Sequence, residues 1–463
     1  MTAATSVADV LVVLGDATSL ARRPPFLIER ADDAAALAAY RALRAAVFVH
    51  EQGLFRGNDL DERDEDPRTV VLVARDRDGT VIGGVRLGPV TDGPDLGWWA
   101  GGRLVVHPAS RGGVGPALVR AACAYAEGAG VLRFEATVQT RNERLFSRIG
   151  WQSVREVTVA GRPHVLMRWP IGRVAALAQG TKSDLGPLLD GMTGVPGFVG
   201  DDGVPVPGSD VVAACDAILP SMVERDPEWS GWCSVLVNVN DLAAMGATPI
   251  GLLDALGARD RSFASRVLAG VRRASQAYGV PVLGGHTQLG VPAALAVTAL
   301  GRCAVPVPGG GGRPGRRVWL TADLDGGWRP GYAGRQWDST SRRRTPELRA
   351  MLSSVARARP DAAKDVSMAG IAGTLGMLAE ASGCGAVLDV AAVPRPAQAS
   401  VGDWLTCFPG FAMLTAGDGP LRAGPATSAA CGELVEGSGV RLRWPDGELT
   451  TVIESGVTGL GTS

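Results

Sequence analysis

A run of glycine and proline at residues 305–315, VPVPGGGGRPG, is the strongest sign of a boundary within this chain. Few residues in such a run can join a helix or an interior strand, so it predicts a linker between folded parts. The chain has 463 residues. Since a domain takes about 100–200 residues, we expect two to four domains with real hydrophobic cores.

Charge and composition exclude several classes of protein. Lys+Arg 46 against Asp+Glu 47 leaves no basic excess, so neither nucleic acid nor a membrane surface is an expected partner. The seven cysteines include no C-x-x-C pair, which favours a reducing compartment. The apolar run at 10–14 is too short for a signal peptide, and no segment has 18 uninterrupted apolar residues. We expect a soluble, cytoplasmic protein.

Residues 26–170 alternate short strands and helices, which predicts one compact α/β unit. Strands are expected at 69–74, 81–87, 132–138 and 164–169, and helices at 34–49 and 114–129. From about residue 171 the segments become longer and richer in Ala, Val and Gly. There we expect strands at 211–218, 235–239 and 293–300, and helices at 271–278, 346–356 and 371–381.

Residues 103–118, RLVVHPASRGGVGPAL, run from a strand through a glycine-rich turn into a helix. Such a turn presents backbone N–H groups at a helix N-terminus, where a pyrophosphate binds well. Taken alone, the turn is equally consistent with a plain strand-to-helix connection.

Two further blocks flank this turn, RAAVFVHEQ at 44–52 and QTRNERLFSRIGW at 139–151. In this order and spacing the three blocks resemble the GNAT acyltransferase family, over about residues 26–170. The resemblance implies that acetyl-CoA or another acyl-CoA binds here. The residues implied in coenzyme A binding are Leu104, Val106, Arg111, Gly113, Val114, Gly115 and Asn142.

Two residues depart from the GNAT pattern. Arg111 lies two residues before Gly113, whereas the family arginine normally lies three before the first glycine of the pair. Phe146 stands where many members have a tyrosine general acid, and a phenyl ring cannot donate a proton. Glu51, His107 and Glu135 are the remaining acid/base candidates, although each also fits a structural role as a helix end, a turn residue or an outward strand residue.

Aspartates mark the second half of the chain: Asp201, Asp202, Asp216, Asp241 and Asp365. Carboxylates brought together by a fold are the usual shell for Mg²⁺, which also takes phosphate oxygens and water. For each aspartate taken alone, a helix cap or a turn residue is the better explanation. The block 238–249, NVNDLAAMGATP, is expected to join a buried strand to a helix.

The ordered set GDD, D, NDLAAMGATP, GGHT and DVS resembles the aminoimidazole-ribonucleotide synthetase superfamily over roughly residues 175–455. Its relatives include thiamine-monophosphate kinase. The resemblance implies that the five aspartates hold Mg²⁺ and that Asn240 contacts a phosphate or orients a ligand. It implies as well that ATP binds at Gly284, Gly285, His286 and Thr287, where Gly284, Gly285 and Thr287 are expected to shape a nucleotide loop. It also implies a homodimer. The arginine-rich stretch 331–344 is open to two interpretations, an anion-binding segment or a solvated loop.

Together these patterns predict a multidomain protein of α/β and α+β class, with a GNAT fold followed by a two-lobed synthetase-like fold. The expected parts are an extension at 1–25, the GNAT-like domain at 26–170, an ATP- and Mg²⁺-binding lobe at 173–306, a linker at 307–316 and a second lobe at 317–463. We expect a bifunctional enzyme acting on a small molecule. The alternatives are a kinase-like enzyme with a non-catalytic coenzyme A module, and a catalytically silent ligand-binding protein.

Overall fold

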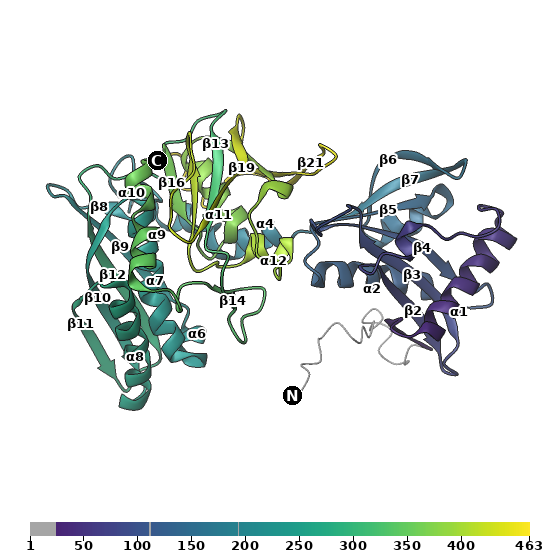
Figure 1. The fold of residues 1–463 in the computed structure, drawn as a ribbon, viewed down its shortest axis with the longest axis horizontal. Coiled ribbons are helices and arrows are strands. Elements are labelled where there is room, and N and C mark those ends of the chain that lie inside the picture. The colour runs from purple at the N-terminus through teal and green to yellow at the C-terminus, as the bar shows by residue number, and fades with distance from the viewer. Residues whose placement is uncertain (1–24, 111–112, 193) are drawn as a thin grey trace. The chain divides into compact units, whose positions relative to one another are not determined.

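The computed structural model describes residues 25–463 apart from 111, 112 and 193. The predicted N-terminal extension therefore lies outside the described residues, except for Pro25. The chain forms two compact units (Figure 1). Unit 1 ends at residue 171 and includes 400–402, and unit 2 comprises 172–399 and 403–463. No helix in the described ranges is long and apolar enough to cross a membrane.

Unit 1 is built on a seven-stranded sheet in the order β1-β2-β3-β4-β5-β7-β6. Only the pair β4–β5 is parallel. The strands are β1 Phe26–Arg30, β2 Val70–Asp76, β3 Val81–Pro89, β4 Trp98–Val106, β5 Arg133–Gln139, β6 Gln152–Val159 and β7 Arg162–Trp169. The helices are α1 Ala34–Arg44, which continues as a π-helical segment Ala45–Glu51, α2 Val114–Gly128 and α3 Glu143–Ile149. The four strands and two helices predicted here are confirmed, within a few residues at their ends.

Helices α1 and α2 cover opposite faces of this sheet. In β2, Val71 and Val73 belong to the core around α1, whereas Leu72 and Ala74 belong to the core around α2. Successive side chains of a strand point to opposite faces, so a continuous apolar run is needed where both faces are covered. The sequence VVLVA in β2 meets this requirement.

Strands β4 and β5 separate partway along their length. They pair only between Trp98–Gly101 and Arg133–Ala136. Beyond Gly101, β4 pairs only with β3, and the register shifts between Gly84 and Arg86. Arg103 in this stretch has φ 53°, an uncommon backbone conformation for a residue with a side chain. The separation opens the space between the two strands in which the unit 1 site lies.

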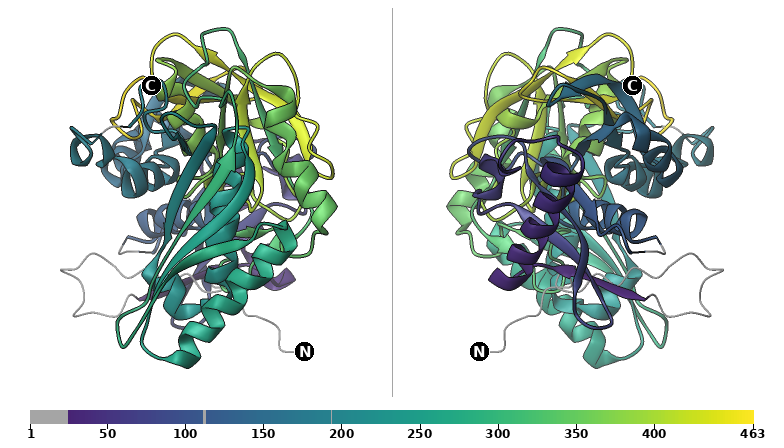
Figure 2. Two further views of the ribbon diagram at one scale, coloured as in Figure 1. Left: turned by 90° about the vertical axis from the view of Figure 1, so that its left-hand side faces the viewer. Right: turned by 90° about the vertical axis from the view of Figure 1, so that its right-hand side faces the viewer.

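Unit 2 begins with a five-stranded sheet in the order β11-β10-β12-β9-β8. Its strands are β8 Val204–Pro205, β9 Val211–Ile218, β10 Thr248–Ala258, β11 Val282–Leu289 and β12 Ala294–Arg302. The helices α6 Pro220–Arg225, α7 Pro227–Ala244 and α8 Arg261–Tyr278 supply its core on one side. In the left panel of Figure 2 the other face of the sheet is turned to the viewer, and no described helix lies over it.

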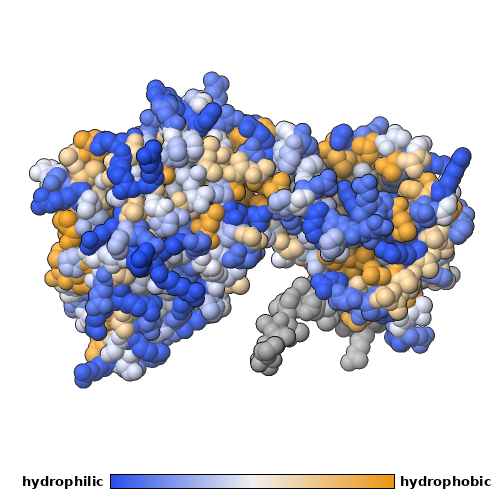
Figure 3. All heavy atoms as spheres, in the orientation of Figure 1, coloured by the Kyte–Doolittle hydropathy of each residue, from blue (hydrophilic) through white to orange (hydrophobic). Residues whose placement is uncertain are grey.

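This uncovered face carries apolar side chains. Leu253 in β10 is 40% exposed, and Leu283 in β11 is 57% exposed. Ile250 in β10 is also exposed. Hydrophobic residues at the left-hand edge of Figure 3 lie over these strands. An apolar face of this kind marks a surface available for contact with another molecule.

A second sheet of unit 2 has seven strands in the order β16-β18-β13-β19-β17-β20-β21. Its strands are β13 Arg317–Ala322, β16 Ala362–Asp365, β17 Gly385–Asp389, β18 Ala412–Ala416, β19 Thr427–Val435, β20 Val440–Arg443 and β21 Leu449–Ile453, and β14 Gly327–Trp328 pairs separately with β15 Trp337–Asp338. The remaining helices are α4 Arg173–Lys182, α5 Leu185–Leu188, α9 Thr345–Leu352, α10 Ser354–Ala358, α11 Gly370–Ala381 and α12 Val401–Thr406.

Two sequence-based expectations about unit 2 are wrong. The run 235–239, predicted as a strand, lies inside α7, almost all of whose residues are buried. A helix buried on all sides has no polar face, so its β-branched residues resemble a buried strand. The block 238–249 accordingly joins the end of α7 to β10, a helix to a strand.

The glycine run after β12 packs closely. A side chain at Gly310 would approach the Ala381 carbonyl oxygen to 2.4 Å, and one at Gly311 would approach the Asp361 carbonyl oxygen to 2.0 Å. Both distances are far inside van der Waals contact. These glycines are therefore required for the run to pack closely against the end of α11 and the segment before β16.

Candidate functional sites

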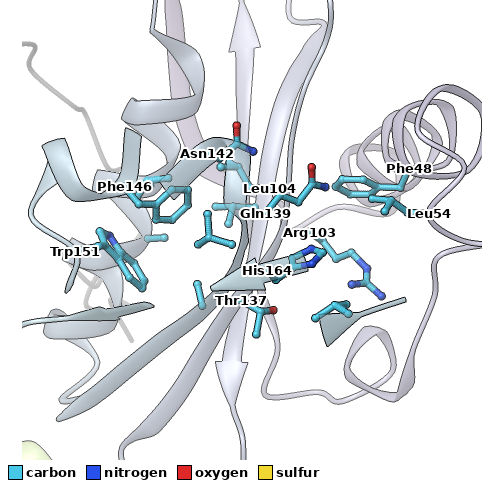
Figure 4. A pocket seen from close by; sticks show the side chains of 18 of the residues that line it. Phe48, Leu54, Arg103, Leu104, Thr137, Gln139, Asn142, Phe146, Trp151 and His164 are labelled. Carbon is cyan, nitrogen blue, oxygen red and sulfur yellow. The ribbon is translucent and has the colours of Figure 1, made fainter. Parts of the chain in front are cut away.

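The unit 1 site is a cavity of about 140 Å³ between β4 and β5. Strands β4, β5 and β7, the helices α2 and α3, and the segment after α1 all contribute to its wall (Figure 4). Its lining is mainly apolar and aromatic, with Phe48, Leu54, Phe55, Phe134, Phe146 and Trp151. The polar lining side chains are Arg103, Thr137, Gln139, Asn142 and His164. Such a wall, apolar with a few polar groups, is typical of a small-molecule site.

Two of the seven predicted coenzyme A residues, Leu104 and Asn142, line this cavity. Gly113 has φ 85° and precedes the first turn of α2, which no side chain caps. The space in front of Gly113 is open, and a side chain at Gly115 would meet Val106 at 3.6 Å. The N–H groups of Gly113, Val114 and Gly115 thus lie at an uncapped helix start, as an anion site requires.

Arg111 lies outside the described residues. The predicted role of this arginine stays a prediction. Phe146 is 7% exposed, and its ring meets that of Trp151 edge to face, with centroids 5.4 Å apart. Phe146 therefore forms part of the cavity wall and cannot donate a proton.

None of the three predicted acid/base residues lines the cavity. Glu51 is exposed in a neighbouring open groove that shares Leu54 and Gln139 with it. His107 is exposed, and its Nδ1 accepts a hydrogen bond of 3.2 Å from the Ala109 N–H. This is the turn role that the sequence left open. Catalytic roles for Glu51 and His107 stay predictions.

Glu135 is buried and fully engaged. One carboxylate oxygen accepts a hydrogen bond from Trp98 Nε1 at 2.9 Å, and the other accepts one from Arg168 Nε at 2.9 Å. Arg133 adds an ion pair at 3.0 Å. Because these partners already occupy the carboxylate, the geometry favours a structural role for Glu135.

His164, Gln139 and Arg103 are site residues that sequence reasoning missed. His164 was placed at the start of a predicted strand, which is correct, but no motif singled it out. Its ring is 6% exposed and lines the cavity. Register along β5 and β7 sets His164 opposite Gln139. The available signal was a histidine at the start of the apolar run 164–167.

A buried network of charges holds the segment after α1 in place. The Arg44 side chain is fully buried and donates to Asp59 Oδ2 at 2.7 Å and to Asp64 Oδ2 at 2.9 Å. Arg103 donates to the Asp59 carbonyl oxygen and to Asp61 Oδ2, each at 3.0 Å, and stacks over Phe55. The network thereby fixes the wall of the cavity that carries Leu54 and Phe55.

The unit 2 site is a group of aspartates from separate elements. Asp241 lies in the last turn of α7 and Asp365 at the end of β16, and both are buried. Their carboxyl groups are close enough to shift each other's pKa, and the exposed Asp216 of β9 acts on both. The fold thus brings three of the five predicted metal ligands together.

Asp202 and Asp201 complete the group through Lys364. The Lys364 ammonium donates to Asp202 Oδ1 at 3.0 Å and to the Gly200 carbonyl oxygen at 2.8 Å. Asp202 Oδ2 also accepts a hydrogen bond of 2.8 Å from the Asp365 N–H. Asp201 accepts one from the Gly309 N–H at 2.8 Å, and its Oδ1 is buried without a hydrogen bond. Lys364 directly precedes the predicted motif DVS and was given no role.

Like charges dominate this group. Burial raises the pKa of Asp241 well above its usual value, and the charges of Asp365 and Asp216 raise it further. Burial, followed by the charges of Asp202 and Asp216, raises the pKa of Asp365 in the same way. One ammonium faces several carboxylates, so a divalent cation at this point would relieve their repulsion.

The donor set fits Mg²⁺ by chemistry, because every donor is a hard carboxylate oxygen. No three or more His, Cys, Asp or Glu side chains in the described ranges are arranged as a ready-made metal site. Mg²⁺ commonly takes only one or two carboxylates and fills its shell with water and substrate phosphates. The group is therefore suited to a cation that arrives with a phosphorylated ligand.

The predicted nucleotide residues lie in two different places. Asn240 is buried next to Asp241, where its Nδ2 donates to the Gly410 carbonyl oxygen at 2.7 Å and its Oδ1 has no hydrogen bond. Gly284, Gly285, His286 and Thr287 form no loop, because they lie in the edge strand β11. The strands β10 and β12 lie between β11 and β9, so three strand spacings separate β11 from β9. At about 4.8 Å per spacing, the four residues lie roughly 14 Å from Asp216.

A hollow of about 650 Å³ lies elsewhere on unit 2, lined from α4, α6 and the segment around β15. Three arginines contribute to it, Arg173, Arg225 and Arg335. Arg173 donates to Asp403 at 2.7 Å, and Arg225 stacks over Tyr332. Within the arginine-rich stretch 331–344, Arg343 pairs with Asp323 and Arg344 with Glu347. The stretch 331–344 is therefore partly an internal ion-pair network and partly the wall of a hollow.

Comparison with known proteins assigns the parts of the chain to families. Residues 34–151 match the acetyltransferase (GNAT) family. Residues 200–303 match the N-terminal domain of AIR synthase related protein, and residues 315–442 match its C-terminal domain.

Relatives align with about half of this chain or less. A protein of Synechocystis sp. named as uncharacterized is 38% identical over 224 residues, covering 47% of this chain and 69% of that protein. One of Methanocaldococcus jannaschii is 30% identical over 243 residues, covering 49% and 73%. A thiamine-monophosphate kinase of Archaeoglobus fulgidus is 30% identical over 122 residues, covering 25% and 40%.

A solved structure supports the fold. The chain is similar to PurL of T. maritima, solved in complex with ATP, with a TM-score of 0.51 and 17% identity over 63% of this chain and 52% of that one. At this level of identity the likeness concerns the fold alone.

Proposed function

Because the chain belongs to the AIR synthase related family and carries a GNAT acetyltransferase domain ahead of those domains, we propose that it is a bifunctional enzyme acting on a small molecule. Unit 1 transfers an acyl group from acetyl-CoA or a related thioester to an amine. Unit 2 uses ATP and Mg²⁺ to activate an oxygen of a substrate. We also propose a cytoplasmic location, in keeping with the absence of any C-x-x-C pair among the cysteines.

The observation that supports acyl transfer is the separation of β4 from β5 beside the uncapped start of α2. Gly113, Val114 and Gly115 would hold the pyrophosphate, and Leu104, Val106 and Asn142 would contact the pantetheine arm. The thioester supplies an activated acyl carbon. The chain's own contribution is to bind this group in an apolar, water-poor cavity and to present the acceptor to it.

The observation that supports ATP use is the convergence of Asp202, Asp216, Asp241 and Asp365. Asp216, Asp241 and Asp365 would bind Mg²⁺ together with phosphate oxygens. The cation supplies neutralisation of the charge that develops during phosphoryl transfer. Lys364 holds Asp202 in place, and its hydrogen bond to the Gly200 carbonyl oxygen fixes the loop that carries Asp201.

We further propose a homodimer formed through the uncovered face of β10 and β11. The exposed apolar side chains on these strands support it. In a dimer, the residues Gly284–Thr287 of one protomer could meet the aspartates of its partner, which would join the two separated parts of the predicted nucleotide site. The hollow lined by Arg173, Arg225 and Arg335 would suit an anionic substrate.

The competing proposal is an ATP-dependent enzyme whose GNAT-like unit only binds coenzyme A. Phe146 favours it, because the usual tyrosine acid is missing. Turnover separates the two: an acyltransferase releases the free thiol from acetyl-CoA in the presence of an amine, whereas a binding module does not.

Binding in unit 1 is tested by thermal unfolding. Acetyl-CoA at 100 times its Kd should stabilise the chain by about 2.7 kcal/mol and raise its melting temperature. If neither acetyl-CoA nor longer acyl thioesters raise it, the unit 1 proposal fails.

Binding in unit 2 is tested with Asp241→Asn. This change keeps the shape of the side chain and removes a charged ligand, so we expect Mg-ATP affinity to fall at least tenfold in calorimetry. Asp418→Asn is the matched control, because Asp418 is 87% exposed and lies on the surface. Equal Mg-ATP affinity for the two variants would count against the metal assignment.

A further inference from the structure

We propose that His164 is the catalytic base of unit 1, taking the proton of the acceptor amine at Nε2. The proposal rests on the acyl transfer proposed above and names the residue that assists it. His164 lies in β7, is 6% exposed, and its ring is among the side chains that line the cavity (Figure 4). A buried histidine facing a cavity is placed to meet a ligand and is shielded from bulk water.

The hydrogen bond on the other side of the ring sets which nitrogen is free. Nδ1 lies 3.0 Å from the Arg162 carbonyl oxygen. A carbonyl oxygen can only accept, so in the neutral ring the proton resides on Nδ1 and the lone pair on Nε2. Among the described residues, the hydrogen bond seen for this ring is the one at Nδ1, and none is seen at Nε2. The ring is therefore oriented by the backbone and presents an unused proton acceptor.

Among the described residues, no other side chain that lines the cavity can act as the base. The remaining polar lining groups are Arg103, Thr137, Gln139 and Asn142. A guanidinium does not give up its proton near neutral pH, and hydroxyl and amide groups are very weak bases. No carboxylate lines the cavity in the described part of the chain. Arg103 is the charged group that shares the cavity with His164.

Glu135 and Glu51, which the sequence suggested as acid/base groups, are less well placed than His164 to act as the base. Glu135 is held by Trp98 and two arginines, and Glu51 lies outside, in the neighbouring groove. That groove adjoins the cavity at Leu54 and Gln139, where an acceptor could enter. Glu51 at this mouth would attract a cationic amine, which gives its ammonium proton to water before it attacks, while His164 inside would accept the proton that the neutral nitrogen loses on attack.

The step balances without any further reagent. The amine nitrogen forms a bond to the acyl carbon as the bond from that carbon to sulfur breaks. The proton that the nitrogen loses goes to Nε2 of His164, and the sulfur leaves as a thiolate. The imidazolium then returns the proton to the thiolate, directly or through water, so one amine and one thioester give one amide and one thiol.

A spectroscopic test does not depend on turnover. The chain has four histidines, so a full-length sample with ¹⁵N-labelled histidine gives few ring signals, and the set missing in His164→Gln belongs to His164. The proposal requires the tautomer protonated at Nδ1, which is the minor form of free histidine. If the neutral ring carries its proton on Nε2, the proposal is overturned.

Two variants separate a base from a structural residue. In His164→Asn the amide nitrogen can keep the hydrogen bond to the Arg162 carbonyl oxygen but leaves nothing at Nε2. In His164→Gln an amide takes the place of Nε2 and cannot accept a proton near neutral pH. His50→Gln is the control, because His50 is exposed and does not line the cavity.

The assay follows thiol release from acetyl-CoA with phenethylamine as acceptor, chosen because Phe48, Leu54 and Phe55 line the cavity. We expect both His164 variants to lose at least a hundredfold in kcat, with unchanged acetyl-CoA stabilisation, and to lose the acidic limb of the pH–rate profile. His50→Gln should match the wild type.

The outcomes distinguish the two proposals. An active wild type with an equally active His164→Asn would overturn the role of His164 and leave acyl transfer standing. A wild type that releases no thiol above the uncatalysed rate would overturn acyl transfer to this amine class, and the role of His164 with it.

Discussion

Replacing Arg44 by methionine should destabilise unit 1 severely. Arg44 is fully buried and donates to two carboxylates, those of Asp59 and Asp64, whose side chains are 2% and 5% exposed. Methionine fills much of the same volume but removes the hydrogen bonds of Arg44, so that Asp64 keeps only Arg86 at 2.8 Å and Asp59 only Arg103 at 3.2 Å. Breaking a buried ion pair in this way costs about 3–5 kcal/mol. The segment that carries Leu54 and Phe55 should loosen with it.

Hydrogen exchange measured peptide by peptide tests this prediction, because the core strand β2 exchanges only when unit 1 opens. A loss of about 3–5 kcal/mol corresponds to exchange roughly 150 to 5,000 times faster. Arg77→Met is the control, since Arg77 is exposed in the turn between β2 and β3. If Arg44→Met costs less than about 1 kcal/mol, the network does not hold this wall, and the reasoning is refuted.

The same network sets a dependence on pH. Burial alone would raise the pKa of Asp64, but the hydrogen bond from Arg44 and the charges of Arg86 and Arg44 lower it to about 2. A carboxylate with a depressed pKa stabilises the fold above its unfolded pKa, near 3.9, and the stabilisation disappears as pH falls toward 2. A shift of this size is worth about 2.5 kcal/mol. The stability difference between wild type and Asp64→Asn should therefore be full at pH 5 and shrink on acidification; a constant difference would contradict it.

Two further changes test other parts of the structure. Glu380 accepts hydrogen bonds from the backbone N–H groups of Val457, Thr458 and Gly459 at 2.6–2.8 Å. Bonds to a charged group are worth about 1.5–3 kcal/mol, so Glu380→Gln should speed exchange of the 457–461 amides at least tenfold; unchanged exchange would contradict this anchor. Leu283→Glu should convert the proposed dimer to a monomer in light scattering, whereas Leu449→Glu, on an exposed position of β21, should not; a dimer that survives Leu283→Glu would exclude this face.

The parts of the fold that sequence reasoning found are those with local signals. In unit 1, runs of β-branched residues between turns located β2 and β3, and the glycine turn located the start of α2. The strand β9, Val211–Ile218, has the predicted bounds. Each of these segments differs from its surroundings in composition over a few residues, which is enough to mark its ends.

The wrong predictions of secondary structure arise where burial in the fold overrides the local sequence pattern. Helix α7 is buried along most of its length, so 235–239 shows no helical periodicity and was interpreted as a strand. Strand β11 shows the opposite problem, because its glycines suggested a loop although it pairs along β10. In both cases tertiary packing, which no short window of sequence contains, decides the structure.

The site residues also fall into two groups, those that a local motif identifies and those that only the fold brings to the site. The aspartates were found because a motif names them, and the fold brings Asp216, Asp241 and Asp365 together as expected. His164, Arg103 and Lys364 were missed or given no role, because each acquires its surroundings from segments distant in the chain. His164 meets Gln139 only through the pairing of β5 with β7, and Lys364 meets Asp202 across 162 positions of sequence.

The central claim is that one chain holds two independent ligand sites, one for an acyl thioester and one for Mg-ATP. Calorimetric titration of the full chain with acetyl-CoA, followed by ATP in the presence of Mg²⁺, tests it most directly. We predict one binding event per chain for each ligand, with the ATP event lost in Asp241→Asn and the acetyl-CoA event retained. Absence of either event in the wild type, or loss of both in Asp241→Asn, would contradict the claim.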